Sequence, residues 1–209
     1  MTIRLHRGDL PNLNAYKGAV AIDTEAMGLD PNRDRLCVVQ LSSGDGSADV
    51  VQIPAGKAGA MPDAPHLMKL LSDKSIVKIF HFARFDVGLL YKTFGVMAEP
   101  IYCTKIASRL ARTYTDKHGL KDLVREVLGI DLSKQQQSTD WGAGELTDAQ
   151  VSYAAADVLN LHALRDKLDA ILVREKRANL AAACFRFLPD RVRLDLAGWA
   201  AEDIFSHSS

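Results

Sequence analysis

Two carboxylates two residues apart in an otherwise apolar segment constrain the fold of this chain most strongly. Residues 19–25 read AVAIDTE, the pattern of a buried strand that carries Asp23 and Glu25 near its end. Residues i and i+2 of a strand point to the same face, so the two side chains project together. Burying two unpaired, mutually repelling carboxylates is costly. A divalent cation would offset both penalties, because Mg²⁺ and Mn²⁺ prefer oxygen ligands. A strand that ends in solvent would also explain the pair.

The order of the elements predicts an α/β fold with strands first and helices later. Gly44, Asp45 and Gly46 predict a hairpin, so one strand pair is antiparallel and the sheet is mixed and flanked by helices. Polar, glycine-containing residues 133–146 predict a loop. The expected strands are 19–25, 35–42, 48–53 and 76–80. The expected helices before residue 130 are 65–72, 83–93, 104–112 and 119–128.

The last third of the chain is predicted to be helical. Thr147 and Gln150 form a capping box that opens a long helix with one apolar stripe. Another helix is expected to end before Pro189, and a shorter segment leads to an irregular tail. We therefore expect one domain over residues 1–172 and a C-terminal helical extension over 173–209. The stripe residues are Val151, Ala154, Val158, Leu161, Leu164 and Leu168.

Composition narrows the class of partner. Lys and Arg number 26, as do Asp and Glu, so the net charge is +0. A neutral chain lacks the broad basic field that nonspecific binding to long nucleic acids uses. No apolar run is long enough to span a membrane and the first residues contain no secretory h-region, so we expect a cytoplasmic protein without a membrane partner. Cys37, Cys103 and Cys184 are expected to be reduced thiols.

Two further acidic elements follow the first pair. Asp86 stands near the start of the helix that follows a strand, among apolar residues that make its burial plausible. A structural acid that complements the helix dipole would also explain it. Tyr153 and Asp157 are four residues apart, which places them on one helical face. A surface pair on an amphipathic helix is the structural alternative for these two residues.

Taken in order, these acidic elements resemble the three motifs of the DEDD superfamily of 3′→5′ exonucleases, in the subgroup whose third motif carries Tyr. DTEAMGLD is similar to the first motif, HFARFDVGLLY to the second, and DWGAGELTDAQVSYAAADVLNL to the third. The resemblance covers residues 19–170, and these features are similar to ribonuclease D. It implies an RNase H-like (DnaQ-like exonuclease) fold with a mixed five-stranded sheet.

The chain resembles one compact branch of that superfamily. After residue 170 there is no room for the C-terminal nucleic-acid-binding domains of ribonuclease D, and the tail is similar to that of the nano-RNase C group. This implies hydrolysis of very short RNA, chiefly diribonucleotides, to mononucleotides, and a homo-octamer. The alternatives are a general ribonuclease D-like exonuclease on longer RNA or DNA, and a catalytically inactive nucleic-acid-binding scaffold. The apolar tail could pack on its own domain or on a neighbouring subunit.

The resemblance also assigns roles to residues. Two divalent metal ions, Mg²⁺ or Mn²⁺, would be held by four carboxylates, and Tyr153 would orient the attacking water. Leu29 would form an apolar wedge between bases, although packing after a turn at Gly28 explains it equally well. Met27 would line the same pocket, and His81 would either touch the substrate or be structural. The metal ligands are Asp23, Glu25, Asp86 and Asp157. The candidates for the 5′ phosphate are Arg109, Arg112, His118, Lys121, Lys134, Gln135 and Gln137.

Overall fold

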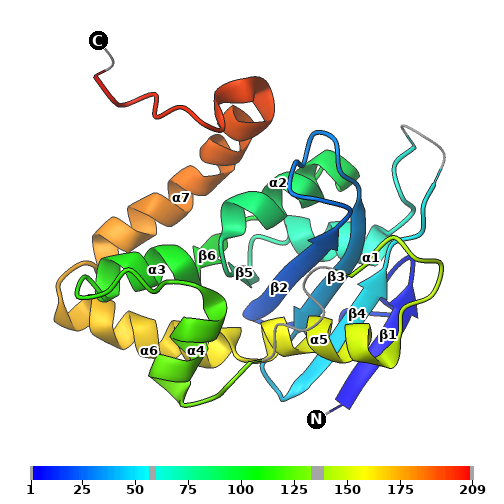
Figure 1. Ribbon diagram of the computed structural model, residues 1–209, viewed down its shortest axis with the longest axis horizontal. Coiled ribbons are helices and arrows are strands. Elements are labelled where there is room, and N and C mark those ends of the chain that lie inside the picture. The colour runs from blue at the N-terminus through cyan, green and yellow to red at the C-terminus, as the bar shows by residue number, and fades with distance from the viewer. Residues whose placement is uncertain (1, 57–59, 133–138, 208–209) are drawn as a thin grey trace.

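A single mixed sheet organises the protein in the computed structural model, which describes residues 2–56, 60–132 and 139–207 (Figure 1). Strand β3 is antiparallel to β2 and β4, and the remaining neighbours are parallel. The predicted antiparallel hairpin between β3 and β4 is confirmed. The six strands in sheet order are β1 (Thr2–Arg7), β4 (Ser47–Gln52), β3 (Leu36–Ser42), β2 (Ala19–Ala26), β5 (Val77–Phe80) and β6 (Ile101–Cys103).

The mixed α/β class is confirmed, but the prediction of five strands is wrong. Strand β1 is an edge strand with largely exposed side chains, so its sequence lacks the apolar pattern of a core strand. Strand β6 has three residues, which is too short for a period to show. Both strands pair with segments that are distant in sequence, and local sequence patterns do not predict such pairing.

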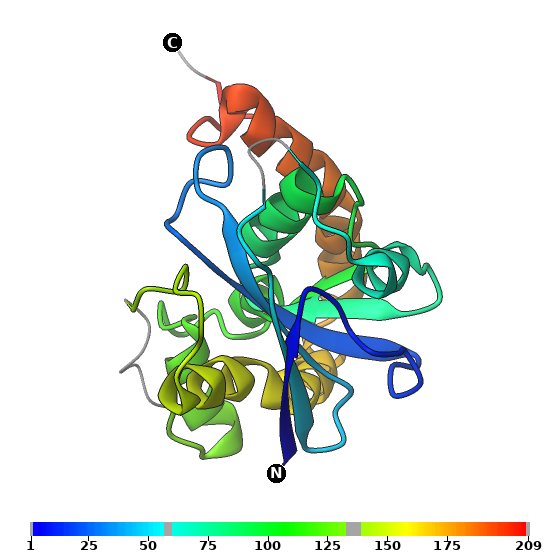
Figure 2. The same cartoon turned by 90° about the vertical axis from the view of Figure 1, so that its right-hand side faces the viewer.

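Helices cover both faces of the sheet, and no described helix is long and apolar enough to cross a membrane (Figures 1 and 2). On one face, Val20 and Ile22 of β2 share a core with α1, α2 and α7. On the other face, Ala19 and Ala21 share a core with α3, α4, α5 and α6. The helices are α1 (Pro65–Ser72), α2 (Ala83–Phe94), α3 (Thr104–Ala111), α4 (Leu120–Leu128), α5 (Asp148–Leu159), α6 (Leu161–Arg174) and α7 (Ala178–Leu194), followed by a short π-helical segment, Asp195–Trp199.

Two of the predicted helix boundaries are wrong. The helix that opens at Thr147 is divided at Asn160 into α5 and α6, although the apolar stripe continues across the break. Helix α7 continues through Pro189 to Leu194. Pro189 removes one backbone donor, but Leu188 and Val192 on either side of it lie in the core against α2, and this packing holds the helix together.

Candidate active site

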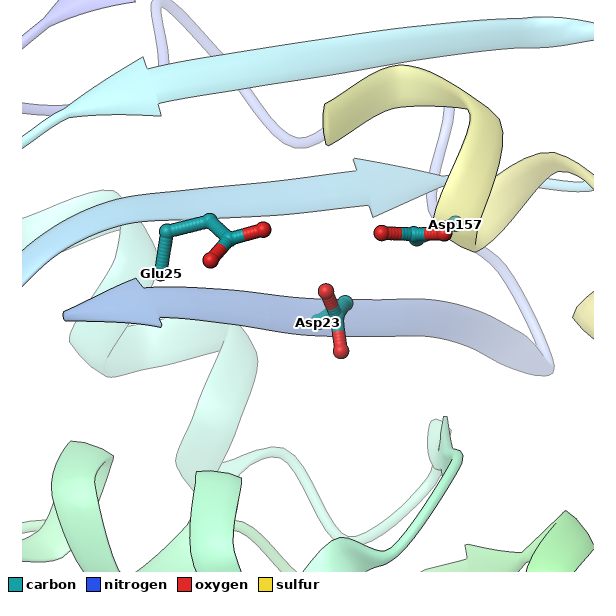
Figure 3. A group of neighbouring side chains, drawn as sticks. All are labelled: Asp23, Glu25 and Asp157. Atoms are coloured by element: carbon teal, nitrogen blue, oxygen red, sulfur yellow. The ribbon is translucent and has the colours of Figure 1, made fainter. Parts of the chain in front are cut away.

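The carboxylates of Asp23, Glu25 and Asp157 meet at the face of β2 that α5 covers. Figure 3 shows Asp23 and Glu25 rising from β2, with Asp157 reaching them from α5. Each offers one oxygen, and these atoms all lie within 4.8 Å of one another. The prediction that the strand pair projects to one face is therefore confirmed.

The local sequence of α5 explains how Asp157 and Tyr153 reach the sheet. The capping box forms as predicted. The backbone N–H of Gln150 donates to Thr147 Oγ1 at 3.2 Å, and the backbone N–H of Thr147 donates to Gln150 Oε1 at 3.0 Å. This fixes the first residue of the helix and hence the direction of its side chains. Ala154 and Ala155 are fully buried, and their small side chains let the helix approach the strands closely.

Asp86 approaches the cluster from the opposite layer. It lies in the first turn of α2, is buried, and accepts a hydrogen bond of 2.7 Å from Thr24 Oγ1. Thr24 lies between Asp23 and Glu25 in sequence, so its side chain faces the other side of the sheet. Phe82, just before α2, has a left-handed φ of 68°, which turns the chain sharply from β5 into the helix.

Burial and mutual repulsion disfavour ionisation of the four acids. Burial raises the pKa of Asp23 well above its usual range, and the charges of Asp86, Asp157 and Glu25 add to this. Burial raises the pKa of Glu25 to about 8, with Asp157 contributing next. Burial also raises the pKa of Asp86 to about 7 and that of Asp157 to about 7, against hydrogen bonds from Thr24 and Tyr153 respectively. The site therefore carries electrostatic strain that a bound cation would relieve.

The donor set fits hard divalent cations. It consists of carboxylate oxygens, which Mg²⁺ and Mn²⁺ prefer, and three of them converge within reach of one ion. Asp23, Glu25 and Asp157 would hold the metal directly, and Asp86 stands beside them.

The acidic cluster opens into a cleft of about 370 Å³. Tyr153 and Leu29 line it together with Asp23, Glu25 and Asp157. Burial, followed by the negative charge of Asp157, raises the pKa of Tyr153 above its usual value, so the hydroxyl keeps its proton at neutral pH. The hydroxyl can therefore orient a water molecule by a hydrogen bond, but it is not itself a base at this pH.

Comparison with known proteins identifies the family. A family model described as 3′-5′ exonuclease matches residues 10–173. The chain belongs to the 3′-5′ exonuclease family. Among curated relatives of this exonuclease, ribonuclease D of Acidiphilium cryptum is 35% identical over 163 residues, which are 78% of this chain and 40% of the relative. Ribonuclease D of Granulibacter bethesdensis is 35% identical over 158 residues, 76% of this chain and 38% of the relative. The exonuclease thus spans about 40% of the length of the curated relatives it matches.

Solved structures include full-length matches to the exonuclease. Brucella melitensis NrnC with bound Mg²⁺ is 58% identical, with a TM-score of 0.94 and complete coverage of both chains. The same protein bound to pGG is 59% identical, with a TM-score of 0.95 and complete coverage. Escherichia coli RNase D is 27% identical, with a TM-score of 0.73 over 85% of this chain and 45% of its own.

Leu29, the predicted wedge residue of the exonuclease, lines the cleft, whereas Met27 and Gly28 are not among its lining residues. Leu29 is 87% exposed, so packing within the chain does not account for its side chain. Gly28 is explained by close approach, since a Cβ there would lie 2.2 Å from Asp34 Oδ2. Met27 is half exposed beside Gly142, where a Cβ would lie 2.3 Å from the Met27 sulfur.

His81 lines the cleft of the exonuclease as a neutral side chain. Burial lowers the pKa of His81 to about 3, and the charge of Lys105 contributes next. Its Nδ1 lies 2.9 Å from Thr104 Oγ1. A fixed neutral imidazole suits a hydrogen bond to a substrate better than it suits an ion pair with a phosphate.

The candidates for the 5′ phosphate are dispersed. Lys121 lines the acidic cleft, whereas Arg109 is exposed on α3 and lines an adjoining cavity. His118 Nδ1 lies 2.9 Å from Ser108 Oγ, beside the cleft. Arg112 is fully buried beside His118: it donates to Ser108 Oγ at 2.9 Å and to the Lys117 carbonyl at 3.0 Å, and it forms an ion pair with Glu126. Lys134, Gln135 and Gln137 lie outside the described residues.

Sequence reasoning missed three residues around the site. Lys105 lines the acidic cleft, with its Nζ 4.3 Å from the Phe82 ring centroid, and no motif marked it. Thr24 and Gln40 contact the carboxylates from within the sheet. The signal for Gln40 was present, because it is a polar residue within the apolar run LCVVQL.

Proposed function

We propose that the protein is a metal-dependent 3′→5′ exoribonuclease that hydrolyses very short RNA, chiefly diribonucleotides, to mononucleotides. The observation that carries the proposal is the convergence of Asp23, Glu25 and Asp157 within 4.8 Å, with Tyr153 lining the same cleft. The full-length match to NrnC, whose solved forms include one with Mg²⁺ and one with pGG, supports the compact short-substrate branch.

The residues would divide the chemistry between them. Asp23, Glu25, Asp86 and Asp157 would hold two divalent ions, Mg²⁺ or Mn²⁺, which when bound lower the pKa of water and stabilise charge on the leaving 3′ oxygen. The protonated Tyr153 hydroxyl orients the attacking water.

The cleft also suggests how a short substrate is held. Leu29 would insert between the two bases, and Met27 would border the same pocket beside Gly28. His81 would hydrogen-bond the substrate. Lys121 would contact its 5′ phosphate, since it already lines the cleft, and Arg109, His118, Gln135 and Gln137 remain further candidates. A chain with net charge +0 suits a ligand with few phosphates.

We also propose that the protein forms a cytoplasmic homo-octamer. Phe187, Trp199, Ile204 and Phe205 are exposed near the C-terminus, more apolar surface than a chain end usually presents. Deletion of residues 200–209 tests the contribution of the tail without removing the core residues of α7. Light scattering should show a smaller assembly, and an unchanged mass would exclude Ile204 and Phe205 from the interface. Cys37 and Cys103 are free and buried, as suits a reducing compartment.

A length series distinguishes the proposed activity from its alternatives. RNAs of two and seven nucleotides with a 5′ phosphate are incubated with Mn²⁺ or Mg²⁺, with EDTA and Asp157→Asn as controls. Metal-dependent loss of the two-mer, much faster than loss of the seven-mer, is the expected result. Similar rates on both would indicate a general ribonuclease D-like exonuclease on longer RNA or DNA. No cleavage by folded protein would indicate an inactive nucleic-acid-binding scaffold.

A further inference from the structure

A fully buried amide contacts the first catalytic carboxylate. Gln40 lies in β3, where every residue is buried, and its own exposed fraction is 0%. It is directly opposite Asp23 in the antiparallel register of β2 and β3. Its Nε2 donates to Asp23 Oδ2 at 3.2 Å. Within the described part of the chain, its Oε1 has no hydrogen-bond partner.

The unpaired side-chain oxygen of Gln40 lowers the stability of the folded state, so the contact of its Nε2 with Asp23 needs a functional explanation. A buried carbonyl oxygen without a donor destabilises the folded state, and an apolar side chain of the same size would avoid that cost. Turning the amide over would not help, because its oxygen would then face the Asp23 carboxylate. The Asp23 contact therefore fixes the orientation of the amide, and it accounts for a polar residue at this position.

Thr24 makes the corresponding contact on the other face of β2. Its hydroxyl donates to Asp86 Oδ1 at 2.7 Å, and both side chains are buried. Asp23 and Asp86 therefore each have one oxygen held by a neutral donor that arises from the sheet. Neutral donors fix the rotation of a carboxylate and leave its negative charge available to attract a cation. A Lys or Arg side chain in the same place would neutralise that charge.

We propose that Gln40 and Thr24 are positioning residues, which hold the Asp23 and Asp86 carboxylates in the orientation that binds divalent metal. The inference rests on the metal site of the proposed function. Outer partners of metal ligands typically change metal affinity by about 10- to 100-fold when removed. The same change is expected here, from residues that would not touch the metal themselves.

The test measures Mn²⁺ binding without RNA, by titration calorimetry and by the Mn²⁺ electron paramagnetic resonance signal. Gln40→Met keeps the side-chain volume and removes the amide donor. Thr24→Val keeps the side-chain shape and removes the hydroxyl donor. Both should weaken Mn²⁺ binding by about 10- to 100-fold. Thr24→Ser restores the donor and should bind within about twofold of wild type. Ser42→Ala is the matched control, since Ser42 is buried on β3 and donates to the Ser47 carbonyl instead.

Several outcomes would overturn the inference. If folded Gln40→Met and Thr24→Val bind Mn²⁺ as wild type does, neither residue positions a ligand. If Ser42→Ala weakens binding equally, the effect is a general loosening of the sheet. Should Gln40→Met fail to fold, as circular dichroism would show, the comparison of Thr24→Val with Thr24→Ser decides. If the wild-type protein binds no Mn²⁺, the metal site of the proposed function is refuted. If the variants bind Mn²⁺ as wild type does, only the positioning role is refuted and the proposed function stands.

Discussion

At the residue scale, the exposed fraction of a side chain distinguishes two candidate substrate-binding residues that could not be told apart in the sequence. Leu29 and Arg112 were both candidates for substrate binding. The structure leaves the Leu29 side chain 87% exposed and buries Arg112 completely against Glu126. Spacing along the chain could not make this distinction, because it reports which face a residue occupies and not what covers that face.

Leu29→Ala should therefore affect binding and not folding. An exposed side chain away from the core contributes within about 0.5 kcal/mol to the free energy of unfolding. Loss of the proposed contact with two bases should raise KM for a diribonucleotide by about tenfold, or about 1.4 kcal/mol. Urea unfolding and steady-state kinetics measure the two quantities. Arg112→Ala is the contrasting variant, with an expected loss of stability of about 2–4 kcal/mol. A stability loss in Leu29→Ala would contradict this expectation.

At the scale of elements, local signals were predictable and long-range ones were not. The capping box of α5, the hairpin between β3 and β4, and the paired acids of β2 depend on neighbours in sequence, and all three were predicted correctly. Strand β1 pairs with β4, which is distant from it in sequence. Helix α7 continues past Pro189 because it packs on α2. Gln40 and Lys105 belong to the site through similarly distant contacts, which explains why the motifs did not reveal them.

The attachment of β1 to β4 should depend on acid pH. Burial would raise the pKa of Asp49, but hydrogen bonds from Arg4, Tyr16 and His6 outweigh it and lower the pKa to about 2. A lowered folded-state pKa gives stability that is complete above the unfolded value near pH 4 and is lost as the pH falls toward about 2.

Asp49→Asn should accordingly destabilise the protein by about 1–2 kcal/mol at pH 7, after allowance for solvent screening. The difference from wild type should shrink by roughly half by about pH 3. Urea titrations across this range measure it. Asp190→Asn, in an exposed pair with Arg193, should show almost no effect at any pH. A difference for Asp49→Asn that is constant with pH would refute the role given to its charge.

At the scale of the whole molecule, the two layers of helices meet the sheet at the acidic cluster. Asp157 comes from the α5 layer and Asp86 from the α2 layer, so the four acids lie together only in the folded protein. Their mutual repulsion opposes folding until a cation is bound. Metal binding and global stability are therefore coupled.

Divalent metal should raise the melting temperature. At a Mn²⁺ concentration about 100 times Kd, stabilisation is about 2.7 kcal/mol, or roughly 5–10 °C for a chain of this size. Asp157→Asn should lose most of this increase, and in EDTA it should be more stable than wild type because one repelling charge is gone. Differential scanning calorimetry with and without EDTA measures both. An equal melting temperature with and without Mn²⁺ would count against a resident metal.

Strand β2 carries its acids on one face and Thr24 on the other. Because of this alternation, a register shift of β2 would affect stability and activity together. A slip of β2 by one residue against β3 would turn both carboxylates toward the apolar layer of α2 and withdraw them from the cleft. The misaligned chain would lose stability and activity in the same event. Cellular quality control that degrades unstable chains would thus also remove inactive ones, so a stably folded but misregistered enzyme would not accumulate.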